Sequence, residues 1–355
     1  AARAGWSVGM TLMMMVGLLS ALFAAGKVPS SPKPVMRRLL PFLTIMLLVL
    51  VVASALIMWR EHYDRVIGRT SLISTDVEWS LKAALERQAR GMAMTALSVA
   101  VDSRVKEALK SGDAERIPIE YQNLFETLHQ DQSLTHLLYC DENRVCLKRV
   151  HQPDLRGDKI DRFTTLEAER TGKAAWGIEI GSVGTAALRL VQPVSEGNKI
   201  VGYIEIGKEI DNILRELQTP SGVEVALSLN KKAMRLEDWE EGMRRMNRNS
   251  DLERLPHSMI IYESKGRLPD VFAQLLDHSP SAEHHEIRSW DIVNAGRNWS
   301  LTISPLDDSS GKEIGDILIM SDTTNLRASF KRDITLGGIV SAVILAALLG
   351  LSYVV

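Results

Sequence analysis

The stretch AALRLVQPVSEGNKIVGYIEIGKEID, residues 186–211, decides the fold expected for this chain. Two apolar runs, residues 186–194 and 200–206, flank the segment Ser195-Glu196-Gly197-Asn198-Lys199. Short apolar runs that are separated by turn-forming residues are typical of antiparallel strands joined by a tight turn. We therefore expect a β-hairpin here.

The residues before this hairpin predict three more strands. The pattern HLLYC-DENR-VCLKRVH, residues 136–151, is typical of another hairpin, and residues 176–180 predict a further strand. The loop at residues 152–174 is expected to contain a short helix at 161–169. Five strands in meander order with this helical insertion predict an α+β, PAS-like sensor domain at residues 135–211.

Residues 60–134 predict helices. Apolar residues recur at helical spacing between residues 81 and 109, and residues 60–110 contain no proline. We expect one long helix, interrupted near Gly91, and then a second helix at residues 114–129. The apolar spacing of the long helix suits packing on its own domains, and it also suits a dimer interface.

A second set of strand patterns follows residue 211. Clusters of turn residues separate five apolar runs, and helical insertions are expected at residues 236–245 and 269–276. These features predict a second, smaller α+β domain at residues 212–333. The five runs are residues 223–229, 258–264, 285–293, 299–306 and 314–322.

Two uncharged apolar segments, residues 39–59 and 335–355, bracket the polar part of the chain. Each is about 20 residues long, which is the length of a helix that crosses a bilayer. We therefore expect a transmembrane-anchored protein that passes the membrane more than once. Residues 1–35 contain a third apolar run at 6–25 and form either an upstream extension or the tail of a longer membrane region.

The charges beside these segments predict their orientation. A basic cluster before residue 39 is typical of the cytoplasmic side, which places the central region outside the cytoplasm, although Lys331 and Arg332 weakly oppose this. We expect an inner-membrane protein whose central region is periplasmic or extracellular, and whose chain is cut at Val355. The basic cluster consists of Lys27, Lys33, Arg37 and Arg38.

Several short motifs follow one another through the first predicted domain. They are Arg149-Val150-His151-Gln152-Pro153, Gly157-Asp158, Gly177-Ile178-Glu179, Leu188-Arg189 and Gly202-Tyr203-Ile204-Glu205-Ile206-Gly207. This order resembles the double Cache (dCache_3-like) extracytoplasmic sensory domain of bacterial transmembrane receptors, and the resemblance covers residues 81–306. It implies a tandem PAS-like sensor with a long N-terminal helix, a small-molecule ligand and a homodimer. It also implies an output beyond Val355, first a histidine kinase, and next a diguanylate cyclase, a nucleotide cyclase or a chemoreceptor.

The alternation of side chains along the strands predicts where a ligand would bind. It places an apolar set against the long helix and a charged set on the opposite face, under the loop at residues 152–174. Paired arginines suit a small carboxylate or amino-acid-like ligand. The alternative is that these charged residues form a solvent-exposed face of an antiparallel sheet and bind no ligand. The candidate ligand-binding residues are Arg149, His151, Asp158, Arg162, Trp176, Glu179, Arg189, Tyr203 and Glu205.

Cys140 and Cys146 flank the turn of the hairpin at residues 136–151, where they would face each other across two strands. A disulfide between them is one reading, and two buried thiols are the other. His151 with Asp158 is a candidate metal pair, but a lone histidine beside a proline is more often a structural hydrogen-bonding residue. His284 and His285 are adjacent on an expected strand and would point to opposite faces, so we expect no metal and no cofactor.

The remaining function classes have less support in the sequence. The net charge of −2 gives no reason to expect a nucleic-acid partner. No Gly-rich phosphate loop, Gly-x-Ser-x-Gly elbow or HExxH motif is present in the sequence, so we expect no catalytic residues here. A membrane-anchored enzyme and a protein-interaction module without a small ligand remain as alternatives to a sensor.

Overall fold

The computed structural model describes residues 33–181, 184–217, 219, 222–245, 251–277 and 287–354. Contacts divide the chain into two units, residues 1–65 with 328–355 and residues 66–327, and each is described by itself. The apolar run expected at residues 6–25 lies outside the described residues, as do His284 and His285.

Helix α2 (Lys33–Ala100) is the longest element of the chain. The interruption expected near Gly91 is wrong, because the helix continues to Ala100 and α3 (Ser103–Ser111) begins after Asp102. The Asp102 carboxylate accepts a hydrogen bond from the backbone N–H of Arg104 at 2.8 Å, so it caps a new helix. A glycine inside a helix only lowers its stability, whereas a capping side chain sets a boundary.

The second predicted helix is divided in two. A single turn, η1 (Ala114–Arg116), precedes α4 (Ile119–Gln132), and Pro118 lies at the N-cap of α4. The expected continuous helix from residue 114 is therefore wrong. Proline has no N–H to donate and clashes with the preceding turn, so a helix can start beside it but cannot run through it.

The first sheet contains β1 (His136–Asp141), β2 (Cys146–Arg149), β3 (Ala175–Ile180), β4 (Ala186–Glu196) and β5 (Lys199–Glu209). All neighbouring strands are antiparallel, in the order β2-β1-β5-β4-β3. The expected meander order is wrong, because β1 pairs with β5 in the middle of the sheet. The long connection between β2 and β3, which contains α5 (Phe163–Thr171), allows the chain to pass from one edge of the sheet to the other.

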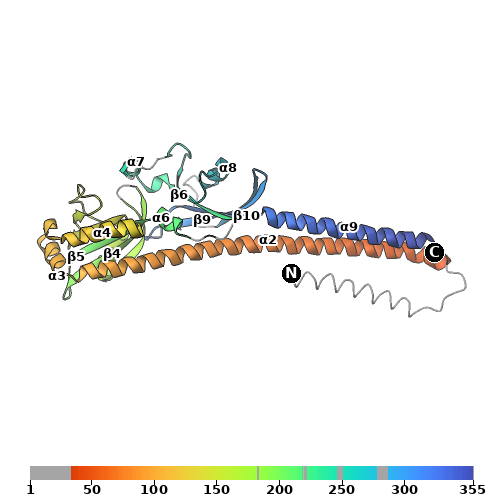
Figure 1. Cartoon of the computed structure of the whole chain (residues 1–355), viewed down its shortest axis with the longest axis horizontal. Helices are drawn as coiled ribbons and strands as arrows, with labels where there is room; N and C mark the ends of the chain where they lie inside the picture. The colour runs from red at the N-terminus through yellow and green to blue at the C-terminus, as the bar shows by residue number, and fades with distance from the viewer. Residues whose placement is uncertain are drawn as a thin grey trace. The chain divides into compact units, whose positions relative to one another are not determined.

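The two faces of this sheet are both covered. One face carries Tyr139, Leu188 and Ile204, which belong to the large apolar core that also includes residues of α2, α3 and α4. Figure 1 shows α3 and α4 beside the labelled strands β4 and β5. The other face carries a smaller apolar cluster with Ala168 of α5. Helix α5 therefore covers the face on which the charged residues were expected.

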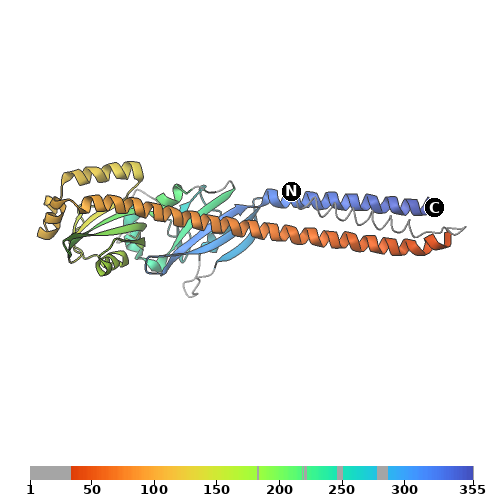
Figure 2. The ribbon, with the colours of Figure 1, turned by 90° about the horizontal axis from the view of Figure 1, so that it is seen from below.

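The second sheet repeats the arrangement of the first. It contains β6 (Val223–Asn230), β7 (Ser258–Glu263), β8 (Arg288–Asn294), β9 (Arg297–Asp307) and β10 (Glu313–Asp322), in the order β7-β6-β10-β9-β8. Apolar residues of β6 and β10 share one core with α2, and Figure 2 shows α2 running along both sheets. The shorter helices of this domain are α6 (Ile210–Arg215), η2 (Lys231–Ala233), α7 (Leu236–Arg245), α8 (Asp270–Ala273) and η3 (Gln274–Leu276).

The other unit contains the start of α2 and helix α9 (Thr324–Val354) from Ala328 onward. The two helices are neighbours, since the rings of Trp59 and Phe330 meet edge to face with their centroids 6.1 Å apart. Both apolar segments of the sequence, residues 39–59 and 335–354, are helical. Within the described residues, no helix meets the combined requirement of length and apolar character for a membrane span.

Candidate functional site

A β-bulge in β2 selects the side chains that reach the face under α5. Cys140 pairs with Cys146 and Tyr139 pairs with Lys148, so Leu147 is an extra residue in its strand. Leu147 packs against the large core on the helix side, while Cys146 belongs to the cluster under α5. Simple alternation would have placed Leu147 and Arg149 on one face. The bulge separates them and lets Arg149 share a face with Cys146.

The centre of the site is a buried ion-pair group of Arg162, Arg189 and Glu205. Glu205 on β5 accepts hydrogen bonds from Arg189 Nη1 on β4 at 2.6 Å and from Arg162 Nη2, just before α5. Arg189 and Glu205 are each 2% exposed. The two arginines that could receive a ligand carboxylate therefore hold the carboxylate of Glu205 in this structure.

Arg149 and Asp158 form a second pair beside this group. Two hydrogen bonds of 2.6 Å join the guanidinium to the carboxylate, and Arg149 Nη1 also donates to the carbonyl of Leu155 at 2.7 Å. Leu138 is the strand partner of both Arg149 and Glu205, so both side chains project to the same side of the sheet. Half of the Asp158 side chain is exposed, so this pair lies at the rim of the site.

Glu179 on β3 joins three segments. Its Oε1 accepts from the backbone N–H of Thr164 at 2.8 Å, its Oε2 accepts from Thr164 Oγ1 at 2.9 Å, and Arg162 Nε lies 3.5 Å from Oε2. Ser309, in the turn between β9 and β10 of the second domain, donates its hydroxyl to Glu179 Oε1 at 2.9 Å. Its backbone N–H donates to the carbonyl of Ile178 at 2.8 Å. Glu179 thus connects the start of α5 with the second domain.

The other predicted site residues occupy different surroundings. Tyr203 is buried under α5 in the apolar cluster with Cys140. His151 lies beside His136, with ring centroids 4.6 Å apart, and its Nδ1 accepts from the backbone N–H of Leu137 at 3.2 Å. Trp176 is 45% exposed and pairs with Leu190, whose side chain faces the helices, so the structure does not bring it to the ion-pair group.

The environment fixes the charge states of the group. Burial acts to raise the pKa of Glu205, but the nearby guanidinium groups of Arg162 and Arg189 outweigh it and lower this pKa to about 2. Burial lowers the pKa of His151 to about 4, and the charge of Arg189 adds to this effect. Both the carboxylate and the neutral imidazole are therefore the stable forms near pH 7.

The two cysteines are free and buried in this structure. Cys140 and Cys146 are direct partners across β1 and β2, and a hydrogen bond between their side chains, together with burial, raises the pKa of Cys140. The disulfide stays a prediction. Within the described ranges, no cluster of three or more His, Cys, Asp or Glu side chains is placed to hold a metal ion.

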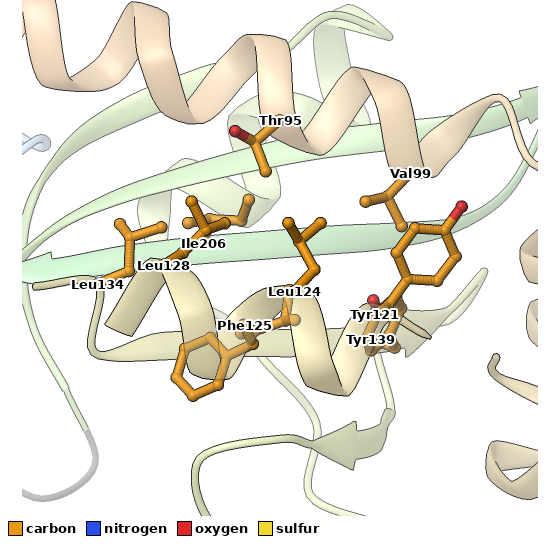
Figure 3. A pocket seen from close by; sticks show the side chains of 10 residues that line it. Thr95, Val99, Tyr121, Leu124, Phe125, Leu128, Leu134, Tyr139 and Ile206 are labelled. Carbon is orange, nitrogen blue, oxygen red and sulfur yellow. The ribbon is translucent and has the colours of Figure 1, made fainter. Parts of the chain in front are cut away.

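A separate cavity between α2, α4 and the first sheet is part of the core. Figure 3 shows Thr95 and Val99 of α2 opposite Leu124 and Phe125 of α4. Its volume is about 10 Å³, which is near the minimum space for one water molecule. The cavity is too small for an organic ligand, although the Tyr139 hydroxyl at its wall is buried without a hydrogen-bond partner in the described residues.

Sequence reasoning missed Thr164 and Ser309, which hold Glu179, and the carbonyl of Leu155, which holds Arg149. Thr164 lies two residues after Arg162 in the expected helix at residues 161–169, and this nearness to a predicted site residue was the only, weak indication in the sequence that it takes part in the site. Ser309 lies 130 residues from Glu179 in the chain, and nothing in its local sequence indicates this contact.

Two antiparallel sheets of the same strand order along one long helix, with a charged group enclosed in the first, define a tandem PAS-like sensor module. The family model dCache_3, described as a double sensory domain of two-component sensor kinase, matches residues 76–326. The chain therefore belongs to this family. No curated protein matches the chain.

Solved structures of sensor domains are similar to this chain at low identity. The sensor domain of the histidine kinase DctB from V. cholerae has 10% identity and a TM-score of 0.41, covering 73% of this chain and 98% of that one. The periplasmic domain of Vibrio cholerae LuxQ has 12% identity and a TM-score of 0.40, covering 70% and 99%. The ligand-binding domain of the Campylobacter jejuni chemoreceptor Tlp3, in complex with 4-methylisoleucine, has 12% identity and a TM-score of 0.34, covering 72% and 93%.

Proposed function

We propose that this chain is the extracytoplasmic ligand-sensing region of a bacterial transmembrane receptor of the two-component histidine kinase type. We propose further that its first domain binds a small carboxylate or amino-acid-like ligand. The family description supports the sensor and kinase parts of this proposal. The observation that supports the ligand class is the pair of guanidinium groups on either side of Glu205, that of the buried Arg189 and that of the partly buried Arg162.

The ion-pair group suggests how a ligand acts. A ligand carboxylate competes with Glu205 for the two guanidinium groups, and Arg162 lies at the start of α5, so this exchange moves the helix that covers the site. Breaking a buried ion pair is costly unless each charge finds a new partner. Binding therefore requires a ligand that also satisfies Glu205, which an amino group does. An amino acid carries both groups, and it shifts the equilibrium only by its differential affinity for the two arrangements.

A thermal-unfolding screen of the whole chain tests this proposal. The ligands are acetate, succinate, malate and the common amino acids, with sodium chloride as the ionic-strength control. A ligand at one hundred times its dissociation constant stabilises the protein by about 2.7 kcal/mol. We expect Arg189→Lys, which keeps the charge but loses the planar fork, to weaken this response, and Arg189→Ala to abolish it.

The matched control is Arg254→Ala in the second domain. Arg254 is partly buried, with 9% of its side chain exposed, and it holds a carboxylate, that of Glu263, at 2.8 Å. This variant should lose stability but keep the ligand-induced shift. An unchanged shift in Arg189→Ala removes Arg189 from the site, and a panel without any response contradicts the ligand class.

One observation favours a second candidate, a protein-interaction module without a small ligand. The three arginines, Arg149, Arg162 and Arg189, already face three carboxylates, those of Asp158, Glu179 and Glu205. Charge balance therefore does not require a ligand. A response to none of the small molecules, together with capture of a folded protein partner by the exposed surface, would favour this candidate.

We also propose that the apolar segments at residues 39–59 and 335–355 anchor the protein in the inner membrane, with the central region outside the cytoplasm. Large apolar side chains that are more than half exposed support this, among them Ile45, Leu56 and Val343. Protease treatment of spheroplasts should cleave residues 66–327. Protection of this region until the membrane is dissolved contradicts the orientation.

A homodimer through α2 is the assembly that we propose. Leu72, Trp79, Met94 and Leu97 are exposed apolar residues of this helix, and they lie within about 60° of one another around its axis. Met94→Cys should form an oxidised dimer in membranes, whereas Glu107→Cys on α3 is the control. Equal cross-linking of both variants contradicts this interface.

A further inference from the structure

Strand β10, at the centre of the second sheet, carries a buried carboxyl group. Asp316 is 6% exposed, and its side chain makes no hydrogen bond or ion pair with the described residues. It pairs with Ser228 on β6 and with Pro305 on β9, and Figure 1 shows β10 beside these strands. A buried carboxyl without partners is stable in its neutral form. Ionisation of Asp316 therefore requires new partners.

Two hydrogen-bond donors in the same sheet also lack partners. Ser228, the direct strand partner of Asp316, is 1% exposed, and its Oγ has no hydrogen-bond partner within the described residues. The same is true of the buried Nε of Arg288, on the edge strand β8. A hydroxyl and a guanidinium are both donors to a carboxylate. The three groups are therefore chemically complementary.

The strand register places Arg288 within reach of Asp316. Arg288 pairs with Ile303 on β9. Pro305, two residues further along β9, pairs with Asp316, so both side chains project to the same face of the sheet. With strands about 4.8 Å apart and a rise of about 3.4 Å per residue, the two Cα atoms lie about 12 Å apart. An extended arginine side chain and an aspartate side chain together span this distance.

The guanidinium of Arg288 has a different neighbour in this structure. Its Cζ lies 5.7 Å from the centroid of the Trp290 ring. Trp290 pairs with Leu301, which lies on the far side of Ile303 from the row of Asp316. Charge-assisted hydrogen bonds are stronger than a cation–π contact at a partly exposed site. An ionised Asp316 therefore competes successfully with the indole, whereas a neutral one does not.

The other charges around Asp316 leave Arg288 as its partner. Burial raises the pKa of Asp316 to about 6, Glu313 on the same strand adds to this effect, and the charge of Arg288 opposes it. Each further cation on the elements around this face is paired with a carboxylate, whereas Arg288 is not, within the described part of the chain. These other charged residues are Glu224 with Lys265, Glu263 with Arg254, Asp322 with Arg297, Asp277, and the exposed Asp270 and Asp307.

We propose that Asp316 is a pH-operated switch of the second domain. When the carboxyl is protonated, the guanidinium of Arg288 lies over Trp290, as in this structure. When the carboxyl releases its proton to solvent, the guanidinium moves to the carboxylate, and Arg288 Nε and the Ser228 hydroxyl donate to it. This gives the protein a response to pH in addition to the proposed ligand response of the first domain.

Strand β8 connects this switch to the start of α9. Asp291, next to Trp290, accepts a hydrogen bond from Arg327 Nη2 at 2.6 Å. Helix α9 begins at Thr324, two residues after the end of β10. The strand that carries Asp316 and the strand that carries Arg288 therefore both reach the first turn of α9. A movement of Arg288 acts on this attachment without any ligand in the first domain.

Fluorine NMR of the whole chain labelled with 5-fluorotryptophan tests the switch, because the Trp290 resonance reports whether a cation lies on its ring. Trp290→Phe assigns this resonance. We expect it to shift in one titration step with a midpoint between the ordinary aspartate value of 3.8 and about 6, since the new ion pair lowers the pKa from the upper value. A Trp290 resonance that stays constant from about pH 3.5 to pH 8 overturns the proposal.

Three variants and one control assign the step. Asp316→Asn should abolish it, and Arg288→Gln should abolish it although Asp316 still titrates. Ser228→Ala should move the midpoint up by about one pH unit or less, because the ionised form loses one donor. The control is Asp291→Asn, which weakens the contact with Arg327 on the opposite face of β8 and should leave the step unchanged.

A step of unchanged size in Asp316→Asn or in Arg288→Gln overturns the proposal, as does loss of the step in Asp291→Asn. The step needs no ligand, and Arg189→Ala should leave it unchanged. A carboxylate screen without any response contradicts the ligand class proposed for the first domain but not this switch. Failure of the proposed ligand response and failure of the switch are therefore separate results.

Discussion

The contact between Ser309 and Glu179 gives a prediction that needs no ligand. Ser309→Ala removes the hydroxyl that donates to Glu179 Oε1 at 2.9 Å, but it keeps the backbone bond from Ser309 to Ile178. A hydrogen bond to a charged group contributes about 1.5 to 3 kcal/mol. Glu179 keeps both bonds from Thr164, so we expect the lower end of this range.

A loss of about 1.5 kcal/mol increases the equilibrium constant for opening of the turn between β9 and β10 roughly tenfold, and amide exchange there becomes faster by the same factor. Amide hydrogen exchange at Ser309 measures this opening, because its N–H is bonded to the first domain. Thr164→Ala should accelerate the same amide from the opposite side, since Thr164 Oγ1 also donates to Glu179. That second effect would show that helix α5, which covers the site, is coupled to the second domain.

Each variant has a matched control. Ser310→Ala changes the next serine, whose hydroxyl donates to Asp308 within the same turn at 2.6 Å. Thr165→Ala changes the next threonine, which is equally buried and whose Oγ1 has no hydrogen-bond partner in the described residues. Neither control should change exchange at Ser309. Equal exchange in wild type, Ser309→Ala and Thr164→Ala refutes the coupling.

Three further predictions concern buried titratable groups. Burial raises the pKa of Asp316 to about 6, so stability is lost as pH rises through 6 and this carboxyl ionises. Asp316→Asn should raise the free energy of unfolding in urea by up to about 3 kcal/mol at pH 7.5 and by little at pH 3.5. Equal effects at both pH values contradict this prediction. The pKa of His151 is lowered to about 4, so its contribution to folding stability is present above pH 6.5 and is lost as pH falls toward 4. The stability of a His151→Asn variant should therefore fall less steeply between pH 6.5 and pH 4. An unchanged dependence of stability on pH contradicts this prediction. Mild oxidation of the native protein should leave Cys140 and Cys146 reactive to a thiol reagent only after unfolding if they stay reduced, and unreactive in both states if they form the disulfide.

Local sequence patterns predicted the strands of this fold well. Turn clusters such as residues 195–199 and the alternation of side chains are local signals, and they place each strand within a few residues of its position in the structure. These local patterns do not predict the order of the strands in the sheet. Pairing of β1 with β5 joins residues about seventy positions apart, such as His136 and Gly207, and no local pattern encodes that choice.

The candidate site shows the same division. Arg189 and Glu205 were predicted to share a face because they lie on neighbouring strands with regular alternation, and they are in contact. Trp176 was expected at the same site, but its position in the register opposite Leu190 turns it to the other face. Ser309 could not be predicted, because its contact depends on how the second domain packs on β3.

The central position of β5 in the first sheet bears on how a change at Glu205 would reach the second domain. This strand is hydrogen-bonded on both sides along most of its length, and it carries Glu205 four residues before its last residue, Glu209. Helix α6 begins at the next residue, Ile210, and leads to the second domain. Because β5 is hydrogen-bonded to a strand on each side, a displacement of Glu205 along the strand axis would also displace Ile210, where the connection to the second domain begins.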